Sequence, residues 1–351
     1  MLKRSIVLAV PDFLPLLDVA REAEAAGFDR IWTTEDPGRD AIVRALTIAM
    51  STQTIGIGTG IAYAFTRSPL ALAATAADVA VASGGRFSLG LGAGTQGMRT
   101  RWYGITEFDH AASRIEEYTE ILRKAWAAER SFSHEGRFYS GSYGELNGVR
   151  PRVPLWGSGI NATMLRIAAR SCDGVAVHPL GAHLRYLDAV VLPAMAQGGA
   201  AAGRAPKLAL WRMTAVDEDG DRARDRARRS LAFYFSTPSY AAAADETGWG
   251  AVAAEIRDTF RERGSDWDAI SRLVPDEMIA EFCLAGTPEE VLADWRALEP
   301  EYAARGVSEA VFQTVGAGAP GEENIRNLRS IVGAFGRVAA TSGPERAGGG
   351  A

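Results

Sequence analysis

Three glycine-rich stretches are the parts of this sequence whose residue types and spacing could bind a ligand. Glycine occupies alternate positions in TIGIGTGIAY and again in SLGLGAGT. Because glycine weakens a strand, its repeated use indicates close backbone approach to another group, such as a flat ring system. The third stretch, WGSGINATMLRIAARS, runs from a strand into a helix, where unpaired amides suit a phosphate. A plain bulge, a tight strand exit and an Asn161 N-cap with nothing bound are the structural alternatives.

Two adjacent carboxylates, Glu35 and Asp36, follow an apolar run in WTTEDPG. A carboxylate can donate a proton near neutral pH only where burial or a neighbouring charge raises its pKa. These residues are therefore candidate acid and base groups. N-capping of the helix that begins in DAIVRALTIAM is their alternative role.

Histidines and arginines complete the polar candidates. His178 ends an apolar run and His183 follows it, but the chain has only four histidines, in separate segments, whereas metal-hydrolase barrels need several His and Asp ligands. We expect no metal, and we expect His178 to face a phosphate or substrate, or simply to be packed. Arg67, Arg99 and Arg101 could meet an anion or remain on the surface.

Eight short apolar runs alternate with longer segments of helical periodicity. The regular alternation requires parallel crossovers, and eight such units predict a closed (β/α)8 TIM barrel, a doubly wound open sheet being the competing topology. The expected strands are Arg4 to Val10, Arg30 to Thr34, Thr54 to Ala62, Arg86 to Gly92, Val153 to Ser158, Gly174 to His178, Lys207 to Thr214 and Glu309 to Val315.

The carboxyl ends of these strands should converge, because parallel α/β folds bind ligands there. Two segments depart from the regular spacing, residues 131–150 and 236–275, and we expect the second to be a helical insertion over the barrel mouth. The glycine-rich end, residues 341–351, is expected to be a disordered tail, so residues 1–340 form one domain.

Composition excludes several classes of function. The formal net charge is −5, which offers no basic face for nucleic acid or an anionic membrane. Cys172 and Cys283 are far apart, so neither a disulfide framework nor a thiolate zinc site is indicated. The apolar run at residues 6–10 is too short for a signal peptide, and no stretch is long enough to span a membrane. We expect a cytoplasmic protein.

The sequence resembles the luciferase-like monooxygenase superfamily, nearest to the deazaflavin-dependent methylenetetrahydromethanopterin reductases and their relatives. The resemblance extends over most of the chain, in family order. It is carried by GFDRIWTTED, GTGIAYAFTRSP, SGGRFSLGLGAG, VPLWGSGINATMLRIAARSCDGV, AGTPEEV and GVSEAVFQTVG.

The resemblance implies roles for the residues that match the family's motifs. It implies a cis peptide bond between Gly60 and Ile61 that supports a cofactor ring, and a cofactor phosphate at the WGSGIN turn. Glu35 matches an acidic residue of relatives that carry Thr-Asp-His, and Asp36 replaces their histidine. Thr95 replaces an acidic residue of sugar-phosphate-oxidising relatives, which argues against that substrate class. The cofactor-binding residues implied are Gly58, Gly60, Ile61, Tyr63, Gly92, Gly94, Thr95, Gly157, Ser158, Gly159, Ile160, Asn161 and His178.

We therefore expect an oxidoreductase that passes a hydride between coenzyme F-420 and a small organic substrate, with Glu35 or Asp36 supplying a proton. An FMN-dependent monooxygenase and a non-catalytic flavin-binding barrel are the alternatives. Relatives commonly pair, so a homodimer or higher homo-oligomer is expected, with an apolar helix such as Pro69 to Ala82 as its interface.

Overall fold

A computed structural model of the chain describes residues 1–10, 12–106, 109–144, 151–315 and 321–336. The expected tail at 341–351, and residues 145–150 of the first irregular segment, lie outside the described residues. Within this part of the chain no helix is long and apolar enough to cross a membrane.

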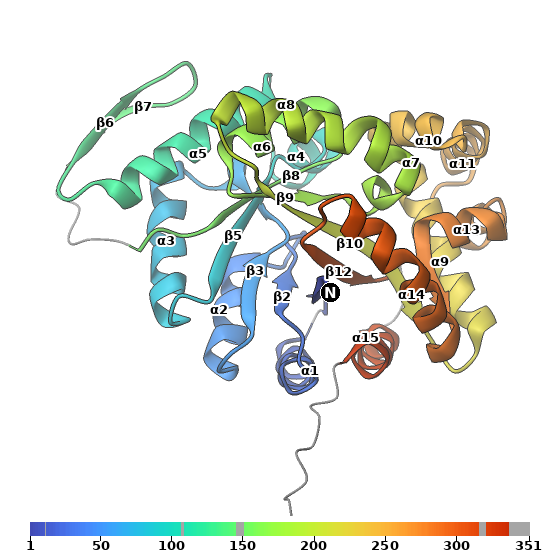
Figure 1. The fold of residues 1–351 in the computed structure, drawn as a ribbon. Coiled ribbons are helices and arrows are strands. Elements are labelled where there is room, and N and C mark those ends of the chain that lie inside the picture. Colours follow the sequence, from blue (N-terminus) through green and yellow to red (C-terminus); the bar gives the residue numbers. More distant parts are fainter. Residues whose placement is uncertain (11, 107–108, 145–150, 316–320, 337–351) are drawn as a thin grey trace, which may run out of the picture.

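Eight parallel strands close into a barrel, as the sequence predicts (Figure 1). The closure is direct, because β10 pairs with β9 at residues 207–210 and with β12 at residues 209–214, while β12 pairs with β1. The barrel strands are β1 (Lys3–Leu8), β2 (Arg30–Thr33), β3 (Gly56–Thr59), β5 (Phe87–Gly92), β8 (Leu155–Gly159), β9 (Gly174–Val177), β10 (Lys207–Val216) and β12 (Glu309–Thr314).

Helices surround these strands on the outside of the barrel (Figure 1). Several begin at a residue that caps them: Asp40 accepts hydrogen bonds from two amides of α2, and Thr287 and Glu290 form a capping box at α14. The helices that follow barrel strands are α1 (Phe13–Ala25), α2 (Ala41–Ser51), α3 (Pro69–Ala82), α4 (Gln96–Trp102), α5 (Ala111–Ala127), α6 (Ala162–Ser171), α7 (Leu184–Tyr186), α8 (Leu192–Ala202), α9 (Gly220–Phe235) and α15 (Gly321–Phe335).

The predicted insertion is helical and is followed by a strand that the sequence analysis missed. The added strand, β11 (Cys283–Gly286), pairs with residues 213–216 of β10 on the edge that β9 leaves free. CLAG is too short and too weakly alternating to indicate a strand by pattern. The helices between β10 and β12 beyond α9 are α10 (Ala241–Thr247), α11 (Gly250–Arg263), α12 (Trp267–Ser271), α13 (Asp276–Phe282) and α14 (Pro288–Ala304).

The first irregular segment contains an antiparallel hairpin, β6 (Phe132–Glu135) and β7 (Ser140–Tyr143), which stands away from the barrel in Figure 1. The third predicted strand is interrupted: β3 ends at Thr59, and the short β4 (Ala62–Tyr63) continues beside β5.

Three tryptophans fill the inside of the barrel. The ring of Trp32 lies 5.6 Å from that of Trp156 and 5.1 Å from that of Trp211, all three buried. Glycines on the neighbouring strands leave room for them, since a Cβ on Gly58 would lie 2.5 Å from the Trp32 ring and one on Gly174 would lie 2.4 Å from the Trp156 ring. The barrel is thus a packed core and not a pore.

A buried carboxylate holds the Trp32 ring in place. Glu309, at the start of β12, accepts hydrogen bonds from Trp32 Nε1 at 2.8 Å and from Ser5 Oγ at 2.7 Å. The Arg30 guanidinium lies 3.5 Å from the same carboxylate, packs over Trp32 and donates to Ser88 Oγ at 2.7 Å. The charges of Arg30 and Glu309 therefore neutralise each other inside the barrel.

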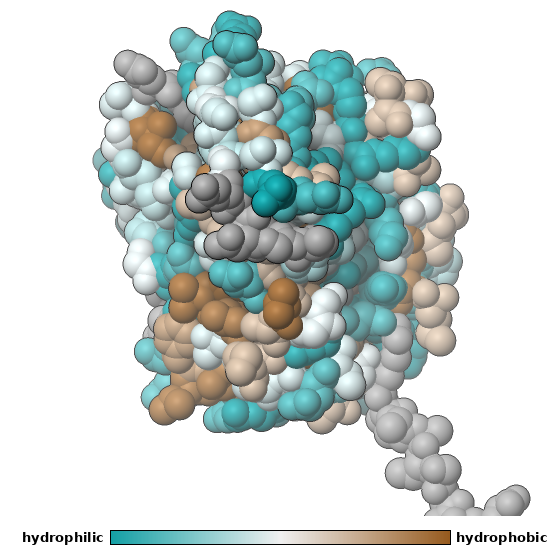
Figure 2. Space-filling model, turned by 90° about the vertical axis from the view of Figure 1, so that its left-hand side faces the viewer, coloured by the Kyte–Doolittle hydropathy of each residue, from teal (hydrophilic) through white to brown (hydrophobic). Residues whose placement is uncertain are grey.

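An apolar patch lies on the outer face of α2 and α3. Figure 2 shows hydrophobic surface gathered low on this face of the molecule. Val43, Leu46 and Met50 recur at helical spacing along α2 with 52%, 36% and 69% of their surface exposed, and Val81 at the end of α3 is 67% exposed. Exposed apolar side chains grouped in this way are typical of an interaction surface.

Gly90→Ala should destabilise the barrel strongly. A Cβ at this position would lie 1.8 Å from the carbonyl oxygen of Thr59, a backbone atom that cannot turn aside. We expect a loss of about 3 kcal/mol in the free energy of unfolding, measured by denaturant titration. The control is Gly333→Ala in α15, where nothing lies within 4 Å and where we expect a gain of about 0.5 kcal/mol. Equal stability of the two variants would contradict this packing.

Candidate active site

The glycine-rich strand ends gather at the carboxyl end of the barrel. A Cβ on Gly92, at the end of β5, would lie 2.0 Å from Ile61 Cδ1 and 2.5 Å from Ser158 Oγ. Three segments that are distant in the sequence therefore meet here: the residues just after β3, the end of β5 and the end of β8. His178 joins them, because its amide donates to the Gly159 carbonyl at 3.2 Å.

A bulge separates β3 from β4 at this meeting point. Gly58 pairs with Ser88 and Ala62 pairs with Leu91, so residues 59–61 face only residues 89–90 of β5. The peptide bond between Gly60 and Ile61 is cis, as the resemblance implies.

Side chains replace the hydrogen bonds that the strand ladder loses at the bulge. The Thr59 hydroxyl donates to the Gly90 carbonyl at 2.8 Å and accepts from the Gly90 amide at 2.9 Å. The Gly60 amide donates to the Thr33 carbonyl at 2.7 Å. Buried backbone groups need such partners, so Thr59 stabilises the bulge.

Glu35 supports the segment after the bulge. Its buried carboxylate accepts from the Tyr63 amide at 3.2 Å and from Arg67 Nη1 at 3.0 Å. Burial raises the pKa of Glu35, while the Arg67 charge opposes that rise. Arg67 also pairs with Asp40, and that residue caps α2. The capping role considered for Glu35 and Asp36 is therefore wrong, because Asp40 performs it.

Asp36 differs from Glu35 in exposure and in partner. Its side chain is 24% exposed, against 4% for Glu35. Arg39 Nε donates to its Oδ1 at 2.7 Å, and the backbones of the two residues also pair. The two carboxylates are adjacent in the sequence, but in the fold Glu35 pairs with Arg67 and Asp36 pairs with Arg39.

The residues after β5 begin α4 and leave a tyrosine beside the mouth. Gly94 adopts a φ of 67°, which favours glycine, and a Cβ there would lie 3.5 Å from the Tyr63 ring. Thr95 Oγ1 caps α4 by accepting from the Met98 amide at 3.3 Å. Arg99 donates to the Gly94 carbonyl at 2.8 Å. Because the cap uses the Thr95 oxygen as an acceptor, the hydroxyl proton can still be donated to a ligand.

The turn after β8 ends in a capped helix. Asn161 Oδ1 accepts from the Met164 amide at 2.9 Å, and the Asn161 carbonyl accepts from the Leu165 amide at 3.0 Å. The amides of Ala162 and Thr163, the first two residues of α6, have no acceptor within the helix, and both residues are exposed. The Ile160 carbonyl accepts from the Tyr186 hydroxyl at 2.9 Å, which anchors the turn.

His178 is held between two tyrosines of the segment that leads into the insertion. Its ring stacks on Tyr240 with centroids 4.5 Å apart and meets the edge of Tyr234 at 4.9 Å. Its Nδ1 accepts from the Leu180 amide at 3.3 Å, so in the neutral ring Nε2 carries the hydrogen. Burial lowers the pKa of His178 to about 3.

The glycine pattern has a partly different cause from the one inferred from the sequence. Gly58 lies inside the barrel over the Trp32 ring, and a Cβ on Gly60 would lie 2.8 Å from Trp211. Gly157 and Gly159 pack against α6, where a Cβ would lie 2.6 Å from Ala168 Cβ and 2.9 Å from Met164 Cβ, respectively. These glycines accommodate the chain's own side chains, whether or not a ligand is bound.

Several residues of this region were missed from the sequence, namely Thr59, Met98, Tyr103, Tyr234, Tyr240 and Gln313. Gln313, a polar residue at the end of the apolar run EAVFQT, is the one for which the sequence contains a signal. The tyrosines come from helices and loops whose position only the fold determines.

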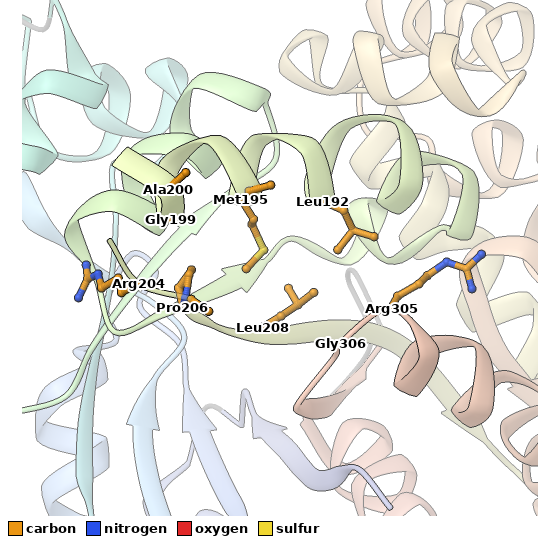
Figure 3. Close-up of a pocket in the computed structure, with 11 residues that line it drawn as sticks. Leu192, Met195, Gly199, Ala200, Arg204, Pro206, Leu208, Arg305 and Gly306 are labelled. Carbon is orange, nitrogen blue, oxygen red and sulfur yellow. The ribbon is translucent and has the colours of Figure 1, made fainter. Parts of the chain in front are cut away.

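Two further features lie apart from this mouth. Figure 3 shows a pocket of about 340 Å³ between α8, the start of β10 and the end of α14, with Leu192, Met195 and Leu208 beside it and Arg204 and Arg305 at its ends. It is at the amino-terminal end of β10, away from the glycine-rich strand ends.

His183 pairs with Glu281 at 2.9 Å. The described residues contain no group of three or more potential metal ligands.

Comparison with known proteins shows the family to which the chain belongs. The family model described as luciferase-like monooxygenase matches residues 5–307. The chain belongs to the luciferase-like monooxygenase family. Among curated relatives, the 5,10-methylenetetrahydromethanopterin reductase of Archaeoglobus fulgidus is 29% identical over 293 residues, covering 81% of this chain and 86% of the relative.

Two solved structures share the fold of this luciferase-like protein. The coenzyme F-420 dependent tetrahydromethanopterin reductase of Methanopyrus kandleri superposes with a TM-score of 0.76 at 22% identity, covering 94% of this chain and 97% of the other. The oxygenating constituent of 3,6-diketocamphane monooxygenase from Pseudomonas putida, in complex with FMN, gives a TM-score of 0.64 at 16% identity over 95% and 97% of the chains. Relatives of both cofactor types therefore have this fold.

His178 should make the protein less stable in acid. Its pKa in the folded state, about 3, is below the usual 6.5, so the unfolded chain takes up the proton first. The contribution to stability is therefore complete above pH 6.5 and is lost as the pH falls toward 3. Relative to His178→Asn, which retains an acceptor for the Leu180 amide, the wild type should lose roughly 2 kcal/mol between pH 7 and pH 4.5.

The matched control is His110→Asn, because His110 is exposed and adopts a left-handed conformation that asparagine tolerates. Unfolding free energies at several pH values measure all three proteins. The buried state of His178 is refuted if His178→Asn and the wild type have parallel pH profiles.

Proposed function

We propose that this protein is an oxidoreductase that uses coenzyme F-420 and transfers a hydride between the cofactor and a small organic substrate. The observation that carries the proposal is the meeting of Ile61, Gly92 and Ser158 beside the exposed amino terminus of α6. Similarity to a methylenetetrahydromethanopterin reductase over four-fifths of the chain supports this cofactor in preference to FMN. When bound, the deazaflavin ring supplies or accepts the hydride.

The residues present fit a phosphorylated ring compound. The amides of Ala162 and Thr163 and the hydroxyl of Ser158 are donors with no acidic side chain among them, as a phosphate requires. The bulge at Ile61 would support the ring. Gly92 lies opposite, and because it has no side chain, the Ile61 side chain has room beside it. His178 and Tyr63 would border it.

The two carboxylates have different proposed roles. Glu35 is buried and holds Tyr63 and Arg67, so it positions the bulge. Asp36 is the more exposed of the two and is held as a carboxylate by Arg39, so we assign to it the acceptance of the proton that a substrate hydroxyl loses as its hydride passes to the cofactor. Its pairing with Arg39 keeps the carboxylate close to the end of β2.

An FMN-dependent monooxygenase is the second candidate. The similarity of the fold to the FMN-bound oxygenating constituent from Pseudomonas putida supports it. Both cofactors carry the same phosphate, so the α6 turn suits either one. A barrel that binds cofactor without turnover is the third candidate, and loss of activity in carboxylate variants would argue against it.

The homodimer expected from the sequence remains a prediction. The apolar patch of Val43, Leu46, Met50 and Val81 on α2 and α3 is the surface that supports it, and it includes the end of the predicted interface helix.

Ala162→Pro should weaken cofactor binding without disturbing α6. Proline is well tolerated at the first position of a helix, and Asn161 before it is already extended, with φ −82° and ψ 155°. The change removes one outward-facing amide, a hydrogen bond to a charged group, so the Kd for coenzyme F-420 should rise about tenfold.

Ala162→Ser, which keeps the amide, is the control. Absorbance titration of each protein with coenzyme F-420 and with FMN measures both affinities. Binding of FMN alone would overturn the deazaflavin assignment. If Ala162→Pro bound either cofactor as tightly as the wild type, the phosphate would not lie at this turn.

The carboxylates should separate in their effects. Glu35→Gln should raise the cofactor Kd about fivefold, because Arg67 loses its buried partner and the support of the bulge weakens. Asp36→Asn should leave that Kd unchanged but slow hydride transfer from an alcohol to the oxidised cofactor about a hundredfold, followed as decay of the oxidised-cofactor absorbance. Equal effects of the two variants on both quantities would refute this division of roles.

A further inference from the structure

We propose that the substrate is an uncharged ring compound with a carbonyl group, bound against a wall of neutral aromatic side chains at the barrel mouth. This inference rests on the proposed function and extends it to a substrate class. The aromatic wall consists of Tyr63, Tyr103, His178, Tyr234 and Tyr240.

The wall consists of two clusters of ring contacts. On one side, the rings of Tyr63 and Tyr103 meet edge to face with centroids 5.7 Å apart. On the other, His178 lies between Tyr240 and Tyr234. Burial raises the pKa of the Tyr63 phenol, and the neighbouring Tyr103 adds to that rise. The two clusters therefore supply neutral aromatic surface from residues far apart in the sequence.

Two of the positive charges near this wall are paired with carboxylates. Arg67 pairs with Glu35 and Asp40, Arg39 pairs with Asp36, and Arg99 donates to the Gly94 carbonyl. Arg101 at the end of α4 is exposed and is the cation whose role the test below must examine. Burying a carboxylate or phosphate of the substrate against the aromatic wall would leave that charge without compensation.

The hydrogen-bonding groups of the wall suit a carbonyl oxygen. Gln313 Nε2 donates to the Tyr234 hydroxyl at 2.7 Å, so the Tyr234 proton is directed to another acceptor. His178 has its hydrogen on Nε2, because Nδ1 accepts from Leu180. The Tyr234 hydroxyl and His178 Nε2 can therefore both donate to a substrate oxygen, and a ketone or enone oxygen accepts such hydrogen bonds.

The rim beside the wall is apolar as well. Trp102 at the end of α4 is 48% exposed, and Met98 of the same helix lies 3.8 Å from the Tyr63 hydroxyl. Ligand pockets are typically apolar with a few placed polar groups, and this arrangement corresponds to that pattern.

Matched ketones test the inference. We would titrate the cofactor-loaded protein calorimetrically with 1-tetralone and with the same ketone carrying a carboxylate on its aromatic ring. The neutral ketone should bind at least tenfold more tightly, in the wild type and in Arg101→Gln alike. Glucose 6-phosphate, as a polyol phosphate, should not compete.

Variants of Tyr240 separate the wall from general disruption. Tyr240→Ala should weaken 1-tetralone binding about tenfold, while Tyr240→Phe, which keeps the ring, should restore it. Phe132→Ala removes an aromatic side chain that stacks on Tyr143 in the β6–β7 hairpin, outside the wall, and it should have no effect. Cofactor affinity should be the same in all of these proteins.

Each result has a definite consequence. Tighter binding of the carboxylate, binding of neither ketone, or a loss of anion binding in Arg101→Gln would overturn the substrate class. Failure of the protein to bind either cofactor in the same titrations would instead overturn the proposed function. Equal ketone binding by Tyr240→Ala and the wild type would exclude the aromatic wall.

Discussion

The packing of Trp32, Trp156 and Trp211 inside the barrel is the constraint on which the rest of the structure depends. Three indoles in a space enclosed by eight strands leave no room for side chains at Gly58, Gly60 and Gly174. The same rings fill the space below the mouth, so any ligand must lie above them. The Glu309 carboxylate accepts a hydrogen bond from Trp32 Nε1 and so fixes the position of that ring.

Above the tryptophans, the bulge at Gly60 and Ile61 is maintained by side chains. Thr59 satisfies both backbone groups of Gly90, and Glu35 satisfies the Tyr63 amide. Glu35 is itself neutralised by Arg67, which reaches Asp40 at the start of α2. The geometry of the mouth is therefore coupled to a helix cap on the outside of the barrel.

Much of the architecture could be predicted from pattern. Continuous apolar runs such as residues 174–178 and 207–214 indicate buried parallel strands, because only a sheet covered on both faces needs them. The insertion was recognisable because its length breaks the regular spacing. β11 was missed, since CLAG becomes a strand only through pairing with the long β10. Family resemblance, and not periodicity, indicated the cis bond between Gly60 and Ile61.

The sequence by itself determined the eight repeating units, the glycine-rich strand ends and the helix amino terminus at Ala162, because these depend on local periodicity and on backbone groups. Only the tertiary structure decided which partners each side chain has. It separated Glu35 from Asp36, assigned the helix cap to Asp40 and brought Tyr234, Tyr240 and Gln313 to His178. Such contacts join residues far apart in the chain, and their energies depend on burial and distance, neither of which is encoded in local spacing.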